Sequence, residues 1–265
     1  MAQKNNIPKS LSDKCALAAR LASWSYIDDS VTRAKLINEF INKAGTASKL
    51  VSINSAECLI VTTTGQLWIA FRGTQPNQLN DLKADLNMVK QKSESAGMVH
   101  TGFKDEVDEL WEEVVKVLNH NGKLAIPRDV YFCGHSLGGA MATIAASRYT
   151  LAKALFTFGS PRVGGKQFVN TCCVPHYRFV NNNDLVAKVP PSILGFKHDG
   201  CEMYFSSKES LVLGNTFWQD FADLFKGLIS SWAKLKFFDG LTDHGMDGYI
   251  YLVDKNKEEI EKCRG

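Results

Sequence analysis

A serine flanked by glycines, Gly134-His135-Ser136-Leu137-Gly138, is the feature of this sequence that most restricts its fold. The apolar run 130–133 before it predicts a strand, and the run 140–146 after it predicts a helix. A strand that turns directly into a helix holds the serine in a strained backbone conformation, and glycines two residues to either side leave room for that turn. The motif therefore predicts an exposed nucleophilic hydroxyl on Ser136. The alternative is a glycine-rich turn whose serine has no chemical role.

The apolar pattern around this motif predicts an α/β fold. Short strands are expected at 129–134, 154–159 and 176–180, with a helix at 137–149 between the first two. A strand, a helix and a second strand in this order imply parallel pairing. The same patterns predict further helices at 11–22, 31–44, 107–118 and 246–253, and further strands at 57–62, 67–71 and 202–205. We expect a single domain over residues 1–265 with a central, mostly parallel sheet flanked by helices.

Composition argues against several functional classes. A net charge of +3, with charges of both signs along the chain, gives no support for nucleic-acid binding. No run of about 18 apolar residues predicts a transmembrane helix, and Met1–Ser10 does not resemble a signal peptide. The expected location is therefore cytoplasmic or soluble. The seven cysteines lack zinc-site spacing and are expected to be free thiols, and neither a metal nor an organic cofactor is expected.

A nucleophilic serine needs a base and an orienting carboxylate, which in α/β-hydrolases follow it in the order carboxylate, then histidine. Of the three histidines after Ser136, His176 begins a predicted strand, whereas His198 and His244 lie in predicted loops. Position alone favours His244 and leaves His198 open. Asp184 follows the strand 176–180, at the end where functional groups of parallel sheets collect. An aspartate that only caps a turn is the alternative for Asp184.

From about residue 58 to residue 253 the chain resembles the class 3 lipases, the family of the fungal triacylglycerol lipases and of plant phospholipase A1 relatives. Several motifs agree with the family in type and order, and together they are specific. They are Phe71-Arg72-Gly73-Thr74, Val99-His100-Thr101-Gly102-Phe103, Gly134 to Ala140, Phe156 to Gly164, Tyr177 to Asp184 with Val189-Pro190-Pro191 behind it, and His244 with Tyr249 five residues later.

The resemblance implies an α/β-hydrolase fold and a catalytic triad of Ser136, Asp184 and His244. It makes His198 a structural histidine and His135 a packing or loop-positioning residue. It also implies an oxyanion hole formed by the amides of Thr74 and Leu137, with an ordinary strand-end cap as the alternative for Thr74.

Two segments are expected to shape the substrate site. The resemblance implies a lid-like segment at about 75–98, in which 75–89 would form a short amphipathic helix; a surface helix that never moves is the alternative. A helical insertion is expected at about 207–240, where an apolar stripe over 217–235 fits either burial in the core or the lining of the acyl entrance.

The expected function is hydrolysis of acyl esters, of triacylglycerol or a similar lipid, with transient contact to a lipid interface and no nucleic-acid partner. The alternatives are a phospholipase A1 or short-chain esterase of the same fold, a non-catalytic lipase-like scaffold, and a membrane-tethering module.

Overall fold

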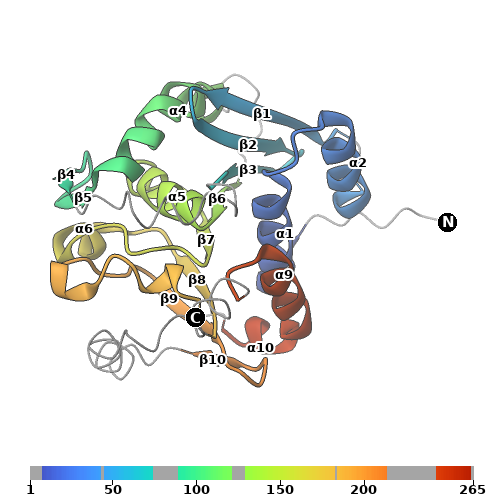
Figure 1. The fold of residues 1–265 in the computed structure, drawn as a ribbon. Coiled ribbons are helices and arrows are strands. Elements are labelled where there is room, and N and C mark those ends of the chain that lie inside the picture. The colour runs from blue at the N-terminus through green and yellow to red at the C-terminus, as the bar shows by residue number, and fades with distance from the viewer. Residues whose placement is uncertain are drawn as a thin grey trace.

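An eight-stranded sheet organises the residues that the computed structural model describes, namely 8–42, 45–73, 89–120, 129–182, 184–213 and 243–263 (Figure 1). The strand order is β1-β2-β3-β6-β7-β8-β9-β10. These strands are β1 (Ala47–Ile53), β2 (Ala56–Thr62), β3 (Gln66–Phe71), β6 (Asp129–His135), β7 (Ala154–Phe158), β8 (His176–Asn181), β9 (Cys201–Phe205) and β10 (Leu211–Leu213). The four pairings from β3 to β9 are parallel, and those of β1 with β2, β2 with β3 and β9 with β10 are antiparallel.

Helices cover both faces of this sheet (Figure 1). They are α1 (Leu11–Trp24), α2 (Ser30–Ile41), α4 (Thr101–His120), α5 (Leu137–Arg148), α6 (Lys166–Thr171), α9 (Met246–Lys255) and α10 (Lys257–Glu261), with short 3-10 turns at η2 (Val186–Lys188) and η3 (Ser192–Leu194). Helix α5 connects β6 to β7, which are parallel neighbours as the strand-helix-strand pattern predicts. The predicted α/β fold with a central, mostly parallel sheet is therefore confirmed.

Alternation along the strands divides the core between the two faces. Trp68 and Tyr131 point toward α1 and α9, whereas their neighbours Ile69 and Phe132 pack with α4 and α5. On the α1 face aromatic rings stack from strand to strand, with centroids 4.4 Å apart for Trp68 and Tyr131 and 5.5 Å apart for Phe156 and Tyr177. Helices and packed side chains therefore cover both faces of the sheet, so a substrate site is expected at the strand ends.

Local chemistry explains where the first helix begins. The hydroxyl of Ser10 accepts a hydrogen bond from the amide of Asp13 at 3.0 Å, which is an N-terminal cap for α1. Small and apolar side chains then let α1 lie against the sheet and against α9, so elements from both ends of the described chain meet on one face (Figure 1).

Two features differ from the sequence-based expectation. Strand β1 was not predicted, because only Val51 among its residues is buried and the apolar alternation is weak. Part of the expected lid-like segment forms an antiparallel hairpin of β4 (Lys90–Lys92) and β5 (Met98–His100). The rest of that segment, 75–88, lies outside the described residues. So does 214–240, most of the expected helical insertion, whose beginning contributes β10.

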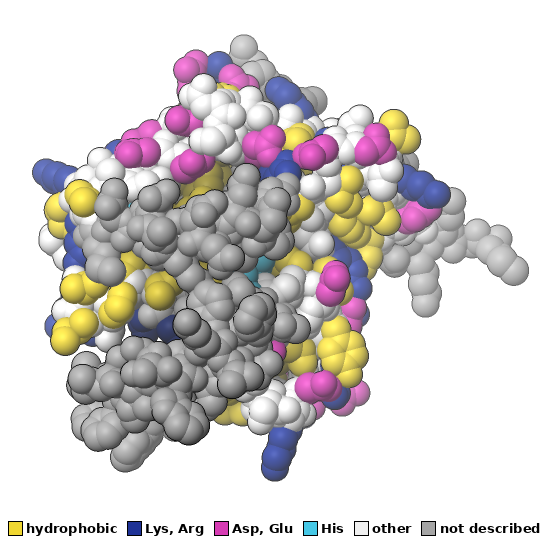
Figure 2. Space-filling view, in the orientation of Figure 1, with side chains coloured by type: hydrophobic (Ala, Val, Ile, Leu, Met, Phe, Trp, Pro, Cys, Tyr) yellow, Lys and Arg dark blue, Asp and Glu magenta, His cyan; other side chains and the backbone are white. Residues whose placement is uncertain are grey.

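No helix within the described ranges is both long and apolar enough to cross a membrane. Side chains of both charge signs are spread over the face shown in Figure 2, in keeping with the small net charge of the sequence.

Candidate active site

Ser136 lies in the sharp turn between β6 and α5, as the glycine pattern predicts. Its backbone has φ 56° and ψ −129°, a strained conformation for a residue with a side chain. A Cβ atom on Gly138 would lie 2.2 Å from the backbone oxygen of Phe71, and one on Gly134 would lie 2.2 Å from the oxygen of Gly138. Only glycines therefore allow this turn to pack against the end of β3.

Asp184 and His244 meet although they lie 60 residues apart in the sequence. The Oδ2 atom of Asp184 is 2.8 Å from Nδ1 of His244, and both side chains are buried. Gly159, just after β7, lies directly against the pair, since a Cβ atom there would be 2.5 Å from Asp184 Oδ2 and 2.8 Å from His244 Nδ1. The amide of Ser136 donates to the backbone oxygen of Phe158, the last residue of β7, at 2.9 Å, so the serine turn lies beside the same end of β7.

Three hydrogen bonds hold the Asp184 carboxylate in place, and a fourth fixes its backbone. Oδ1 accepts from the amide of Val186 at 2.9 Å, and Oδ2 accepts from the hydroxyl of Tyr249 at 2.6 Å as well as from His244. The amide of Asp184 itself donates to the oxygen of Asn181. Burial acts to raise the pKa of Asp184, but the imidazole of His244 and the hydrogen bonds from His244 and Tyr249 outweigh it and hold the pKa below its ordinary value.

This carboxylate determines the tautomer of the imidazole. An ionised carboxylate only accepts hydrogen bonds, so Nδ1 of His244 carries the hydrogen and Nε2 keeps its lone pair. Among the described residues, neither Nε2 of His244 nor Oγ of Ser136 has a hydrogen-bond partner, although both atoms are buried. The prediction of an exposed hydroxyl on Ser136 was therefore wrong, because the turn packs closely against the ends of β3 and β7. The turn of Ser136 and the Asp184–His244 pair both lie at the end of β7, beside Phe158 and Gly159 respectively. Catalytic hydrogen bonds are often long in ligand-free enzymes and shorten when substrate binds.

The other histidines have different partners. Nε2 of His198 lies 2.7 Å from the backbone oxygen of Ala187, which agrees with a structural role. His176 forms a second histidine-aspartate pair, with Nδ1 3.0 Å from Asp199 Oδ2 and Nε2 2.8 Å from the hydroxyl of Thr157. His135 contacts Tyr26 on one side and the backbone of His244 on the other. Burial lowers the pKa of all three of these histidines.

Of the two predicted oxyanion donors, the structure describes one. The amide of Leu137 lies in the first turn of α5, where amides have no partner within the helix and carry the positive end of its dipole. Thr74 lies outside the described residues; Gly73, just before it, is described and packs against the turn that contains Ser136.

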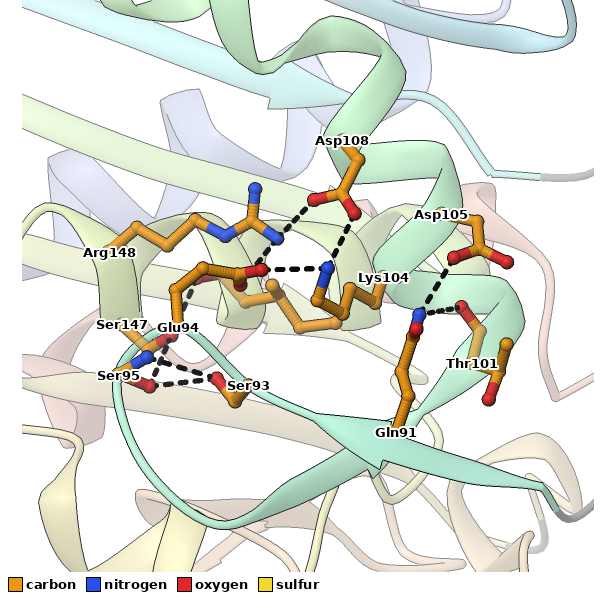
Figure 3. Close-up of polar contacts among 11 residues, drawn as sticks. Gln91, Ser93, Glu94, Ser95, Thr101, Lys104, Asp105, Asp108, Ser147 and Arg148 are labelled. Atoms are coloured by element: carbon orange, nitrogen blue, oxygen red, sulfur yellow. Dashed lines mark hydrogen bonds and ion pairs between the residues drawn. The ribbon is translucent and has the colours of Figure 1, made fainter.

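An ion-pair cluster fixes the β4–β5 hairpin to the helices on the α5 face (Figure 3). Glu94, in the hairpin turn, pairs with Lys104 of α4 at 2.7 Å and with Arg148 of α5 at 2.8 Å. Both cations also pair with Asp108, each at 2.5 Å. The hairpin, which follows the undescribed stretch 74–88, is therefore attached to the helix that begins just after Ser136.

Comparison with known proteins supports the reading of these motifs. Residues 68–193 match the family Lipase (class 3), a stretch that contains Ser136 and Asp184. Over this matched stretch the chain belongs to the class 3 lipase family. A lipase from Rhizomucor miehei is 33% identical over 153 residues, which are 53% of this chain and 42% of that one. The chloroplastic phospholipase A(1) DAD1 of Arabidopsis thaliana is 30% identical over 220 residues, which are 70% of this chain and 48% of that one.

Solved structures of lipases have the same fold. A triacylglycerol lipase whose catalytic centre is a serine protease triad is 26% identical with a TM-score of 0.62, and the match covers 74% of this chain and 80% of the other. In the comparison with the lipases of Rhizomucor miehei, Rhizopus niveus and Rhizopus oryzae, by contrast, the matched stretch spans only 40–42% of the relative's length.

No contact with this site was predicted from the sequence for Tyr26 or for Tyr249. Tyr26 lies in the connection after α1, and no local pattern marks it. Tyr249 was noted only through the family resemblance, and its bond to Asp184 depends on how α9 packs. The signal in the sequence that could have indicated this contact is a tyrosine on the apolar face of the predicted helix that follows His244.

Proposed function

We propose that this class 3 lipase hydrolyses carboxylic esters of lipids, with Ser136 as nucleophile, His244 as base and Asp184 as the residue that orients the base. The observation that carries the proposal is the buried bond between Asp184 and His244 beside the strained turn of Ser136. A carboxylate that fixes the imidazole tautomer leaves Nε2 ready to accept the serine proton. The proposed mechanism uses the side chains of this triad, backbone amides and water.

The proposed reaction has two steps. Ser136 Oγ attacks the ester carbonyl carbon while its proton passes to Nε2 of His244, and the carbonyl oxygen becomes an oxyanion that the Leu137 amide, and the Thr74 amide if it is placed as the family resemblance implies, can stabilise. The carbon–alkoxide bond then breaks, and the alcohol leaves with the proton from His244. Water next attacks the acyl-enzyme with the same proton movements and releases the acid and Ser136.

Acylglycerols are the proposed substrate class because the lipases of Rhizomucor and Rhizopus and a secreted mono- and diacylglycerol lipase of Fusarium solani are among the relatives. A phospholipid substrate is the second candidate, since the similarity to phospholipase A(1) DAD1 extends over a larger share of this chain, 70%, than that to the Rhizomucor lipase, 53%. Exposed apolar side chains at Val89, Ile193 and Leu194, beside the β4–β5 hairpin, support transient contact with a lipid surface.

The mechanism is tested with p-nitrophenyl esters from acetate to palmitate, assayed with Ser136→Ala, Asp184→Asn and His244→Gln. We expect each variant to lose on the order of 10³-fold or more in kcat. The matched controls are Ser147→Ala at the other end of α5 and His176→Gln and Asp199→Asn in the second histidine-aspartate pair, all of which should retain near-normal rates. Wild-type rates in the three site variants would contradict the mechanism.

Substrate class needs a separate assay. Tributyrin emulsion and phosphatidylcholine vesicles are offered to the wild-type protein, and the released acids are titrated and identified. Faster hydrolysis of tributyrin supports the acylglycerol proposal, whereas release of the sn-1 acid from phosphatidylcholine at the higher rate would replace it with the phospholipase A1 alternative. A protein that is inactive on both substrates and on every p-nitrophenyl ester would support the non-catalytic scaffold.

A further inference from the structure

The side chain of Tyr26 lies where three separate parts of the site meet. Its hydroxyl is 3.2 Å from Nδ1 of His135, the residue before Ser136. Nε2 of the same imidazole is 2.7 Å from the backbone oxygen of His244. On its other side the phenolic oxygen packs against Gly73, the residue before Thr74, where an added Cβ atom would lie 2.6 Å from it. The connection after α1 thus touches segments that lie far apart in the sequence.

The chemistry of the partners determines which atom donates in the two hydrogen bonds of His135. A carbonyl oxygen only accepts, so Nε2 of His135 must carry the hydrogen that faces His244. Burial, with help from the neighbouring His244, lowers the pKa of His135 to about 3, so its imidazole is neutral near pH 7. A neutral imidazole with its hydrogen on Nε2 has an acceptor at Nδ1, and therefore the hydroxyl of Tyr26 donates to it. The phenolic oxygen keeps its lone pairs and lies against the backbone of Gly73.

Packing around Gly73 is equally close. A Cβ atom on Gly73 would lie 2.6 Å from the hydroxyl of Tyr26, 2.6 Å from the backbone oxygen of His135 and 3.1 Å from the amide nitrogen of Gly138. The strand-end loop that leads to Thr74 therefore rests directly on the Tyr26 hydroxyl and on the serine turn.

Charged neighbours hold the Tyr26 ring in place. The guanidinium of Arg72 lies over the ring, 5.7 Å from its centroid, and pairs with Asp28 at 2.7 Å and with Glu57 at 2.5 Å. Arg72 is the residue before Gly73, so one short segment fixes the tyrosine ring through its side chain and contacts the hydroxyl through its backbone.

We propose that Tyr26 is a positioning residue of this site, whose hydroxyl couples the loop at Gly73 to the main chain of His244 through the neutral imidazole of His135. The inference rests on the proposed function, because it assigns His244 as the base. Tyr26 does not exchange a proton with substrate in this scheme. It maintains the distance between the loop that leads to the oxyanion donor and the residue that removes the serine proton.

Tyr26→Phe keeps the ring and removes only the hydroxyl. We expect kcat for a soluble p-nitrophenyl ester to fall about 10-fold with little change in KM, because the base and the loop lose their common support. Tyr131→Phe is the matched control, since Tyr131 is a buried tyrosine of β6 that packs in the core on the α1 face. The rate of this variant should stay within about twofold of wild type. Equal rates for Tyr26→Phe and wild type would overturn the proposal.

A double-variant cycle separates coupling through His135 from general loss of packing. If Tyr26 acts through this imidazole, Tyr26→Phe combined with His135→Asn should reduce kcat no more than the larger of the two single changes. If the loss in kcat of the double variant equals the product of the two single losses, Tyr26 and His135 act independently, and the proposed coupling through His135 is overturned.

The third measurement needs neither activity nor a Tyr26 variant. Nitrogen-15 spectra of the imidazoles in the Ser136→Ala protein should show His135 neutral from about pH 5 to about pH 8, with its hydrogen on Nε2. A hydrogen on Nδ1 would overturn the relay even if the protein hydrolysed esters. Conversely, wild-type protein without esterase activity but with the expected tautomer would contradict the proposed function and leave the hydrogen-bond chain intact.

Discussion

Nε2 of His135 lies 2.7 Å from the backbone carbonyl oxygen of His244, so the residue beside the proposed nucleophile holds the main chain of the proposed base. The two imidazole rings are 4.4 Å apart at their centroids. Two charged imidazoles at this distance would repel each other, and burial keeps His135 neutral. In the proposed mechanism His244 therefore takes up a proton without a second charged imidazole beside it.

Buried neutral histidines should make the protein less stable in mild acid. The pKa of His135 is lowered from 6.5 to about 3, so between these pH values the unfolded chain binds a proton that the folded chain does not. The free energy of unfolding should then fall as the pH drops below about 6.5, by up to about 1.4 kcal/mol per pH unit from this residue. His135→Asn should reduce the slope by up to that amount, as measured by urea unfolding at several pH values. Ser147→Ala is the control, and an unchanged slope in His135→Asn would contradict the expectation.

Tyr249→Phe should loosen Asp184. The hydroxyl donates to Asp184 Oδ2 at 2.6 Å and accepts from the buried amide of Asn181 at 3.0 Å, so its removal leaves both groups with one partner fewer. We expect a loss of about 1–3 kcal/mol in the free energy of unfolding and a rise in the pKa of Asp184. Tyr251→Phe on the same helix, where the side chain is exposed, should change stability by less than about 0.5 kcal/mol. Equal unfolding curves for the two variants would argue against the role of the Tyr249 hydroxyl.

Gly138→Ala should damage the serine turn. Its Cβ atom would lie 2.2 Å from the backbone oxygen of Phe71, and a backbone atom at the end of a central strand cannot move aside easily. We expect a loss of at least about 2 kcal/mol in stability, together with loss of esterase activity. Gly65→Ala is the matched control, because no atom lies within 4 Å of a Cβ added there. A stable, active Gly138→Ala protein would mean that the β6–α5 turn packs differently.

Arg148→Met should release the β4–β5 hairpin. The change removes a cation whose side chain is 5% exposed and leaves Lys104 alone to pair with Glu94 and Asp108. We expect a loss of about 1–3 kcal/mol in the free energy of unfolding. Lys116→Met removes a cation that is 53% exposed and pairs with Glu112 and Glu113, and it should cost less than about 1 kcal/mol. If the two variants unfold alike at low salt, the cluster in Figure 3 does not fix the hairpin.

Sequence patterns were informative where the physical signal is local. The run of apolar residues before Gly134 and the small residues after Gly138 predicted β6, α5 and the turn between them, because strand, turn and helix each leave a pattern in adjacent residues. Order along the chain and loop position then selected Asp184 and favoured His244, and the family resemblance removed His198. The pairing of Asp184 with His244 followed from that choice.

Contacts between distant segments left no such pattern. Tyr26 and His135 are 109 residues apart, and nothing near Tyr26 in the sequence indicates that its hydroxyl reaches the serine turn. Strand β4 consists of Lys90, Gln91 and Lys92, which have no apolar alternation, so only its pairing with β5 identifies it. Strand β1 is an edge strand with one buried residue, and its position depends on β2.

The proposed activity depends on the packing of α1 against α9, two helices from opposite ends of the described chain. Tyr26 follows α1 directly, and His244 immediately precedes α9, so any fluctuation that parts these two helices would displace the proposed base while the central strands remain paired. Inactivation on warming should therefore precede melting of the sheet, and ester turnover would report the separation of these helices earlier than circular dichroism reports loss of β-structure.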